Sequence, residues 1–474
     1  MSLQGKSEIW QYVLLVVIVL LSRLPFISAG YGLDGDSWSV AIFAQLLHDT
    51  GVYSASRLPG FPVHEFLSSF LINTGFVGLN LMTAIFSAIA VLFFALTLKV
   101  LRFKYIFLGA FTFAMVPVFY INSTTTIDYV IATAFIMAGM YFLLRNKIVF
   151  AGILLGFAIG TRITSGAMLI PFSILLIEND GLKNILKRIS KLTITSIITG
   201  LVLFSPVLKE YGMGFFSYYY FPYPSISKVL YKFSIEVWGV IGFLGLIIST
   251  SLLFLPDRIT LKKFLFPRAV NEKFVVAWLV AIDLYIIAFL KLPMEGGYLI
   301  PIIPFVIMIF GKYLYNKAFV FLCIMLILSS FVCSISPVER FDSVEPSKAA
   351  YNFNSGGEEL LFDFYKGPFI SYQDRRRNGI EFVDELLNST DTIKSKSVIV
   401  AGRWYNQMVM QSGDTSKLNF TLRPYIKEEE AVYFYAKGYV IYYLPKQDFF
   451  NKVMKNVDLD IYGAIPYLKE QKSY

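Results

Sequence analysis

Long apolar runs separated by short polar stretches fill the first two-thirds of the chain. Runs of about 15 to 22 residues have the length that an α-helix needs to cross a bilayer. The fifth and sixth runs are short for a full crossing, which suggests a re-entrant or internally buried pair. We count roughly eleven runs, near residues 10–29, 76–101, 105–121, 128–144, 148–161, 163–177, 192–209, 236–255, 274–291, 297–311 and 317–336. The pattern predicts an all-α polytopic membrane module over residues 1–336.

The pattern changes after about Ser336, because residues 337–474 contain no further apolar run of spanning length. KSVIVAG (396–402) and AVYFYAKGYVIYYL (431–444) read as strands, whereas NGIEFVDELLNS (378–389) has helical spacing. We therefore predict a small α/β domain over residues 337–474. It contains two sequons, at Asn388 and Asn419, which would be open to glycosylation on the extracytoplasmic side.

Composition agrees with a membrane protein. Of 474 residues, 56% are hydrophobic, 17% aromatic and only 16% charged, which excludes an ordinary soluble domain. The two cysteines, Cys323 and Cys333, share one late apolar run, so they form neither a disulfide framework nor a zinc ribbon. The net charge of +9 would suggest nucleic acid as a partner of a soluble chain, but here its distribution matters more than its sum.

The basic residues are sorted by side of the membrane. If the N-terminus is cytoplasmic, alternate loops carry Arg102 and Lys104, Arg145 and Lys147, Lys183 to Lys191, Arg258 to Lys273, and Lys312 and Lys317. The positive-inside rule then places these loops on the cytoplasmic side of the membrane, which is a cell membrane or an ER-like membrane. The loop at 30–75 and, after an odd number of spans, residues 337–474 face outward. The first run reads as an anchor rather than a cleaved signal peptide.

The outward loop begins with two acids, Asp34 and Asp36, beside the end of the first apolar run. WSVAIFAQLLHDTG (38–51) follows them with the spacing of an amphipathic helix lying in the membrane interface. An acid so close to hydrocarbon is either solvated or kept for a function. Both acids could be ordinary loop residues, and Asp36 could cap the helix.

Short motifs stand between and at the ends of the apolar runs in a definite order. They are DSWSVAIFA with Asp36, TGVY, SRLPGFP with Glu65 after it, STTTIDYVIATAFIMAGMYFLLR with Asp128, AGILLGFAIGTRITSG with Thr161 and Arg162, and LPMEGGYLIPIIPF with Tyr298, Pro301 and Pro304. This ordered set, over residues 10–320, resembles the GT-C glycosyltransferases of the protein-mannosyltransferase and aminoarabinose-transferase type.

The chain departs from that family at two positions. Ser37 follows Asp36 where the family often has a glutamate, which puts metal binding or acid pairing there in doubt. Gly297 precedes Tyr298 where the family often has an arginine, which suggests that a phosphate or sugar contact is lost or moved.

The resemblance implies transfer of a sugar from a polyprenyl-phosphate carrier to a glycan, lipid or protein acceptor on the outer face, most simply with inversion. The acceptor must lose a proton, for which Asp36 is the candidate base and Asp34 its support. The leaving group is an anionic phosphate, onto which Arg162 and Arg57 could fork. Snorkelling to lipid headgroups is the alternative for both arginines. The sequence identifies no cofactor and leaves a requirement for a divalent cation open.

Glycines 152, 156 and 160 are spaced for close helix packing, which favours Arg162 facing protein rather than lipid. Asp128 is either a helix cap or a partner of Asp36 in binding acceptor or a divalent cation. The resemblance adds Glu65 and Tyr298 as substrate-binding positions. His48 and His64 lack a clear third ligand for a zinc site, so we predict no metal centre from them.

The stretch from Phe215 to Ser234 is dense in aromatic residues. It reads as an interfacial belt, or else Tyr219 and its neighbours line a groove for the prenyl chain or stack on sugar. Two other functions stay open at this stage. A transporter or flippase of lipid-linked sugars would place charged sites near mid-membrane, and a non-catalytic scaffold would only bind glycan.

Overall fold

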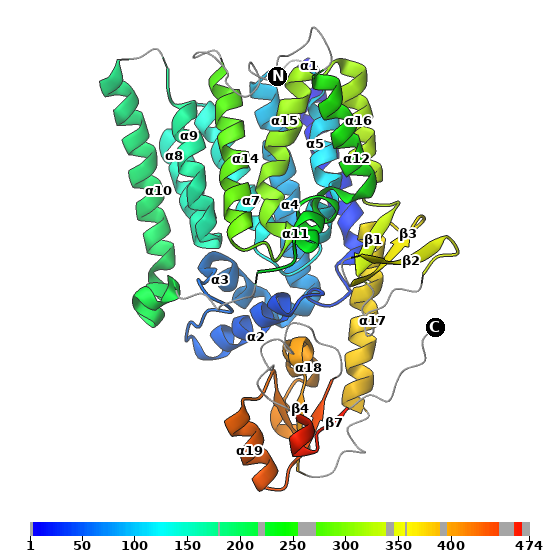
Figure 1. Cartoon of the computed structure of the whole chain (residues 1–474). Helices are drawn as coiled ribbons and strands as arrows, with labels where there is room; N and C mark the ends of the chain where they lie inside the picture. The colour runs from blue at the N-terminus through cyan, green and yellow to red at the C-terminus, as the bar shows by residue number, and fades with distance from the viewer. Residues whose placement is uncertain are drawn as a thin grey trace.

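Nearly parallel helices form one layer of the molecule, and short helices and two small sheets lie at one end of it (Figure 1). The computed structural model describes residues 3–178, 181–216, 223–254, 272–337, 346–355, 358–388, 396–444 and 459–466. The helices of the layer are α1 (Leu3–Arg23), α4 (Gly75–Val100), α5 (Ile106–Met115), α6 (Pro117–Asn122), α7 (Tyr129–Leu144), α8 (Ile148–Thr161), α9 (Leu169–Leu175), α10 (Leu182–Tyr211), α12 (Ile235–Leu253), α14 (Lys273–Lys291), α15 (Ile303–Tyr313) and α16 (Asn316–Leu328).

Each predicted apolar run contains a helix, so the predicted helical membrane module is confirmed. Six stretches of the described chain are long and apolar enough to cross a membrane: Ile9–Phe26, Pro62–Val100, Leu182–Phe216, Ile235–Leu253, Lys273–Lys291 and Gly296–Tyr313. Five further apolar helices are shorter, with 10–17 residues. The number of crossings, eleven, stays a prediction.

The α8 helix packs closely on α10, as its glycine spacing predicts. A Cβ atom on Gly156 would lie 2.4 Å from Thr199 Cβ, and one on Gly152 would lie 2.8 Å from Thr195 Cβ. Only a hydrogen atom fits in that space, so the two backbones approach along a seam of small residues. The packing turns the end of α8, where Arg162 follows, toward the protein interior.

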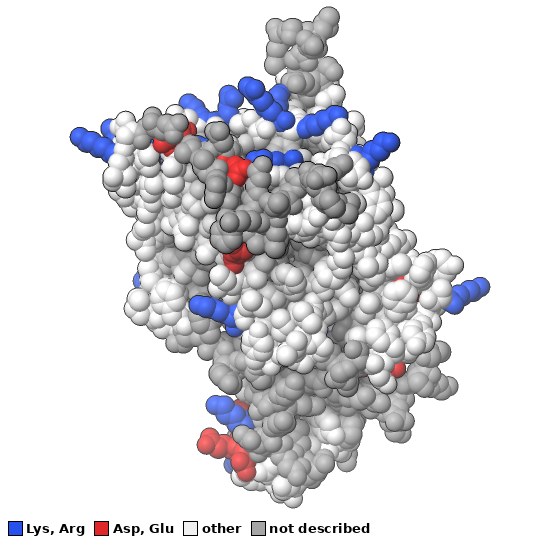
Figure 2. Space-filling view, turned by 45° about the horizontal axis from the view of Figure 1, so that its top comes forward, with Lys and Arg blue, Asp and Glu red and all other residues white. Residues whose placement is uncertain are grey.

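Lysine and arginine side chains gather along the rim of the layer opposite α2 (Gly35–Thr50) and α3 (Pro62–Leu71), as Figure 2 shows. On that rim Glu178 pairs with Arg188 at 2.5 Å and with Lys273 at 3.7 Å. The basic loops within the described residues therefore lie on one side of the helical layer. Which side of a membrane this rim faces remains the prediction of the positive-inside rule.

The amphipathic run after Asp36 forms α2, which lies with α3 across the ends of the long helices (Figure 1). The helix begins at Gly35, and its N-cap is Asp34 rather than Asp36. The prediction that Asp36 could cap this helix is therefore wrong. The cap lies two residues earlier because the Asp34 carboxylate accepts a hydrogen bond from the Ser37 backbone N–H at 2.8 Å.

The C-terminal region is α/β, as predicted. Strands β1 (Ser334–Pro337), β3 (Glu358–Asp363) and β2 (Ala350–Ser355) form an antiparallel sheet in that order. Helix α17 (Pro368–Asn388) leads to a second, parallel sheet with the order β5 (Thr421–Arg423), β4 (Ser397–Val400), β6 (Val440–Tyr443) and β7 (Ile465–Pro466). Helices α18 (Tyr405–Ser412) and α19 (Glu428–Ala436) accompany this sheet. The predicted domain boundary at residue 336 falls inside β1.

The stretch 431–444 is only half strand, which corrects the prediction. Its first part belongs to α19, and only Val440–Tyr443 forms β6. Three glutamates in the first turn favour the helix, because negative charge is stabilised at a helix N-terminus. Ala431 and Phe434, three residues apart, are the buried face of that helix.

Helix α17 fixes the C-terminal region to the membrane module. The buried guanidinium of Arg376 donates hydrogen bonds to the carbonyl oxygens of Ala29 at 3.0 Å, Gly30 at 2.7 Å and Thr124 at 3.1 Å. Phe369 stacks on Tyr120 with ring centroids 3.8 Å apart. These contacts hold the backbone just before Asp34, so the C-terminal region helps to position the acidic loop.

The remaining short elements connect these parts. They are α11 (Ile226–Phe233) and the 3-10 turns η1 (Leu24–Phe26), η2 (Ile72–Thr74), η3 (Ile163–Met168), η4 (Gly212–Phe216), η6 (Gly296–Ile302), η8 (Gly402–Trp404), η9 (Thr415–Lys417) and η10 (Leu459–Tyr462).

Candidate active site

Four charged side chains form a continuous chain of ion pairs where α2 and α3 meet the helical layer. Arg57 Nε lies 3.1 Å from Asp36 Oδ2, and Arg57 Nη2 lies 2.6 Å from Asp128 Oδ1. Arg162 Nη1 lies 2.6 Å from the other oxygen of Asp128. Four residues that stand far apart in the sequence, between positions 36 and 162, therefore meet in one cluster.

The members of this cluster differ in exposure. The side chain of Asp128 is fully buried, and those of Arg57 and Arg162 are 17% and 15% exposed. The side chain of Asp36 is 42% exposed. Of the two carboxylates, only Asp36 is open to a substrate.

Asp128 anchors the two arginines, because each of its oxygens pairs with one guanidinium. Its side chain makes no capping hydrogen bond at the start of α7, so the helix-cap alternative is wrong. Arg57 pairs with both Asp36 and Asp128. The Arg57 guanidinium supplies, between Asp36 and Asp128, the positive charge that a shared divalent cation would have supplied. The two acids therefore do not fit a cation site.

The Asp34 carboxylate is held by the helix that it caps. Besides the Ser37 N–H, it accepts a hydrogen bond from the Ser37 hydroxyl at 3.2 Å. Burial, and then the negative charge of Asp36, raise the pKa of Asp34. Ser37, the residue by which the chain departs from the family pattern, is thus the partner that fixes the acidic turn.

Glu65 organises the loop that carries Arg57. Its carboxylate accepts hydrogen bonds from the Tyr53 hydroxyl at 2.5 Å, the Ser56 N–H at 2.7 Å and the Ser56 hydroxyl at 2.6 Å. It also accepts one from the Phe61 N–H at 3.2 Å, and the residue is only 1% exposed. The prediction that Glu65 contacts substrate is corrected, because its oxygens are occupied by its own loop.

Aromatic rings enclose the two guanidinium groups. The Arg162 Cζ atom lies 4.3 Å from the centroid of Tyr129 and 5.2 Å from that of Tyr298. The Arg57 Cζ atom lies 4.1 Å from the centroid of Phe61. Such faces attract a planar cation. Arg162 is therefore stacked inside the protein, and snorkelling to lipid is excluded for it.

The second departure from the family pattern also has a packing explanation. A Cβ atom on Gly297 would lie 2.7 Å from a ring carbon of Tyr129. Any larger residue would push out the ring that stacks on Arg162. Gly297 therefore leaves the space that the Tyr129 ring occupies, and an arginine at this position would not fit beside that ring.

Two polar side chains of the site are buried with unused hydrogen-bonding groups. Arg57 Nη1 and both ring nitrogens of His64 have no hydrogen-bond partner among the described residues. A buried N–H without an acceptor costs about 1–3 kcal/mol. The free donor of Arg57 suits an additional oxygen, such as one from an anionic ligand.

Glu295 is a site residue that the sequence analysis did not select. It accepts a hydrogen bond from the Tyr129 hydroxyl at 2.5 Å. Burial, and then the negative charges of Asp34 and Asp36, raise the pKa of Glu295 to about 7. Such a shift is common at functional sites. The signal in the sequence was its position in LPMEGGYLIPIIPF, two residues before Gly297.

The raised pKa of Glu295 predicts a pH-dependent stability. An unfolded glutamate titrates near pH 4.3, so between about pH 4.3 and 7 the folded chain binds more protons than the unfolded chain. Stability is therefore lost as the pH rises through this window. Glu295→Gln, which stays neutral, should raise the melting temperature at pH 8 by several degrees and change it little at pH 4.5. Thermal unfolding in detergent would show this, and an equal change at both pH values would contradict it.

Of the remaining predicted positions, Tyr219 lies outside the described residues. His48 contacts the carbonyl oxygen of Ser69 at 3.1 Å and the amide of Asn73 at 2.9 Å. Within the described parts of the chain, no group of three or more His, Cys, Asp and Glu side chains could hold a metal ion.

Comparison with known proteins adds a likeness in fold. Neither a protein-family model nor a curated protein matches the chain. The crystal structure of ArnT from Cupriavidus metallidurans in the apo state matches with a TM-score of 0.52 at 12% identity, over 96% of this chain and 89% of that chain. ArnT from the same organism bound to undecaprenyl phosphate gives a TM-score of 0.44 at 14% identity, over 66% of this chain and 60% of that chain. The first match shows that this chain shares the fold of that protein.

Proposed function

We propose that this integral membrane protein is a glycosyltransferase that moves a sugar from a polyprenyl-phosphate carrier to an acceptor on the extracytoplasmic side. The observation that carries the proposal is the ion-pair chain, in which buried Asp128 holds two arginines beside the exposed carboxylate of Asp36. The order of the sequence motifs and the fold shared with ArnT support the same function.

The arginines would bind the phosphate of the donor. Arg57 offers a buried N–H that has no acceptor among the described residues, and Arg162 is fixed between Asp128 and two tyrosine rings. Hydrogen bonds from a guanidinium to phosphate are charge-assisted and strengthen as negative charge develops on the leaving oxygen. The two arginines would therefore stabilise the departing polyprenyl phosphate.

Asp36 would act on the acceptor. A hydroxyl or amine of the acceptor attacks the anomeric carbon, and its proton passes to the Asp36 carboxylate as the bond to the phosphate oxygen breaks. The new bond forms on the face opposite the leaving phosphate, so the configuration inverts. Asp34 would support this step by capping α2 and thereby fixing the turn that presents Asp36.

The position of the cluster favours transfer over transport. Transporter sites lie near mid-membrane, where broken helices face each other. Here the charged residues stand at the ends of α7 and α8, in the first turn of α2 and in the loop between α2 and α3. Such a site is open to an acceptor from outside the bilayer.

The proposal is tested with purified full-length protein in detergent. A panel of polyprenyl-phosphate sugars, with undecaprenyl and dolichyl carriers, is incubated with an acceptor extract, and free polyprenyl phosphate is measured. We expect release with at least one donor, dependent on the acceptor. If no donor is consumed, while the protein moves the same lipids across proteoliposome membranes, the transport alternative replaces this proposal.

Arg162→Lys is expected to lower turnover by about 10- to 100-fold although the charge is kept. An ammonium cannot fork onto two oxygens, and a hydrogen bond to a charged group contributes about 1.5–3 kcal/mol. Release of polyprenyl phosphate measures the effect. Arg188→Lys, on the opposite rim, is the matched control and should keep full activity. Near wild-type turnover of Arg162→Lys would remove Arg162 from the proposed mechanism.

A further inference from the structure

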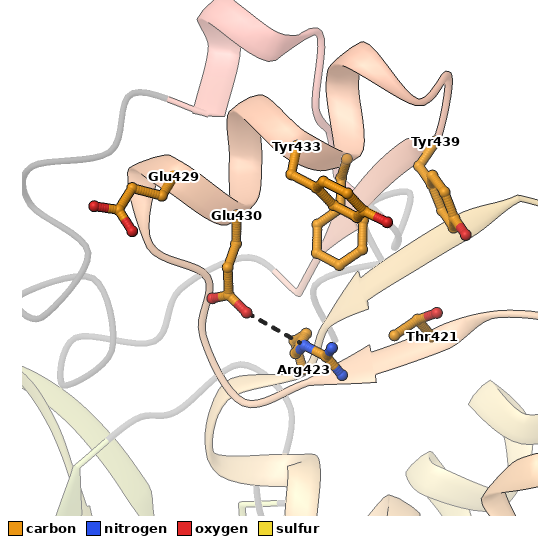
Figure 3. Close-up of a pocket in the computed structure, with 7 residues that line it drawn as sticks. Thr421, Arg423, Glu429, Glu430, Tyr433 and Tyr439 are labelled. Atoms are coloured by element: carbon orange, nitrogen blue, oxygen red, sulfur yellow. Dashed lines mark ion pairs between the residues drawn. The ribbon is translucent and has the colours of Figure 1, made fainter.

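A pocket of about 430 Å³ opens on the C-terminal α/β region, between the parallel sheet and α19. Thr421 and Arg423 reach it from β5, Glu429, Glu430 and Tyr433 from α19, and Tyr439 from the turn before β6 (Figure 3). The volume lies within the range of small-molecule sites. It is separate from the ion-pair cluster, because α19 lies at the end of the molecule away from the long helices (Figure 1).

One wall of the pocket is aromatic and rigidly supported. Tyr433 is 55% exposed, whereas its neighbour Phe434 is 6% exposed and belongs to the core beneath the sheet. The Phe434 ring meets Tyr433 edge-on at 5.5 Å and Tyr439 at 5.3 Å between centroids. Tyr433 therefore presents its ring to solvent and Tyr439 is half-buried beside it, while a buried phenylalanine sets the positions of both.

The rest of the lining is polar and carries one guanidinium and two carboxylates. Arg423 Nε lies 3.6 Å from Glu430 Oε1, and both side chains are about 40% exposed (40% and 42%). Glu430 is fixed further, because its other oxygen accepts a hydrogen bond from the Lys427 N–H at 3.1 Å. The Thr421 hydroxyl and the exposed carboxylate of Glu429 complete a set of donors and acceptors.

We propose that this pocket binds a carbohydrate. A pyranose ring has an apolar C–H face that packs on an aromatic ring and a rim of hydroxyl groups that need paired donors and acceptors. Tyr433 and Tyr439 suit the apolar face of the sugar, and the Arg423–Glu430 pair suits its hydroxyl rim. A guanidinium can donate two hydrogen bonds to hydroxyl groups, and a carboxylate can accept two from them. Two carboxylates against one guanidinium favour a neutral or amine-bearing sugar over an acidic one.

The pocket would hold the distal part of an extended glycan acceptor. This identification of the glycan as acceptor rests on the proposed transferase function, whereas carbohydrate binding itself does not. Because the pocket lies away from Asp36, only an acceptor of several sugar units could occupy both places. Holding it on the same chain would raise its effective concentration at the transfer site.

The test measures binding of chitotetraose, maltotetraose and cellotetraose to the full-length protein in detergent by saturation-transfer NMR and calorimetry. We expect saturable binding of at least one probe, weakened about tenfold by Tyr433→Ala. Tyr435→Ala is the matched control, because Tyr435 is on the same helix and 58% exposed but does not line the pocket. No binding of any probe, or equal loss in both variants, would overturn the proposal.

A second pair of variants tests the polar wall. Glu429→Gln should weaken binding several-fold, and Glu428→Gln, one residue outside the pocket, should not. Binding should survive 0.5 M salt, because neutral hydroxyl groups are the partners. If a tetralysine peptide binds instead of the sugars and is released by this salt, the acidic first turn of α19 is a peptide site and the proposal fails.

This inference and the proposed function can fail separately. Asp36→Asn should keep full binding of the tetrasaccharides, since Asp36 lies outside the pocket. If wild-type protein binds sugar but transfers none, the transferase proposal fails and the binding site stands. If wild-type protein transfers sugar but binds no probe, the carbohydrate-binding proposal fails and the transferase proposal stands.

Discussion

Asp36→Asn is expected to lower turnover by about 100-fold or more, while the donor lipid still binds. Asparagine keeps the shape of the side chain but cannot accept the proton of the acceptor. The donor site is preserved because Arg57 and Arg162 remain held by Asp128. Release of polyprenyl phosphate measures turnover, and quenching of protein fluorescence by the lipid measures binding.

The controls for this substitution come from the same turn and helix. Asp34→Asn should cost less activity, because asparagine caps a helix almost as well as aspartate. Asp49→Asn, exposed near the other end of α2, should have no effect. Full activity in Asp36→Asn would remove Asp36 as the base. Glu295 would then be the next candidate, since both oxygens of Asp128 are taken by arginines.

Asp128→Asn is expected to abolish transfer and to destabilise the fold by about 3–5 kcal/mol, the cost of removing one partner from a buried ion pair. Asp128 is fully buried and is the only carboxylate among the described residues that pairs with Arg162. Its loss leaves Arg162 without a carboxylate partner among the described residues and leaves Arg57 paired with Asp36 alone. We therefore expect Arg162 to leave its position and Arg57 to be held less firmly. Thermal unfolding and donor binding should fall together.

Glu178→Gln is the matched control. Glu178 also bridges two cations, Arg188 and Lys273, but its side chain is 47% exposed on the opposite rim. An exposed pair contributes about 0–1 kcal/mol, so this variant should unfold almost like the wild type. Equal destabilisation by the two substitutions would contradict the anchoring role of Asp128. An Asp128→Asn variant with normal transfer would contradict the proposed donor site.

The apolar runs determined the helical module, because burial in a bilayer or a helical core needs only length and hydrophobicity. The glycine spacing of 152, 156 and 160 likewise predicted close packing of α8, although α10 was not identified as its partner. Periodicity was less reliable in the C-terminal region. The run at 431–444 alternates like a strand, but the preceding glutamates and the buried pair of Ala431 and Phe434 make its first part helical.

The sequence by itself also selected the charged residues of the site, since acids and arginines beside apolar runs are costly and therefore conspicuous. Only the tertiary structure decided their roles. It made Asp34 the cap, Glu65 the centre of its own loop and Asp128 the anchor of two arginines, and it added Glu295. A hydrogen bond or ion pair depends on distances of about 3 Å between groups far apart in the chain, and spacing along the sequence does not contain those distances.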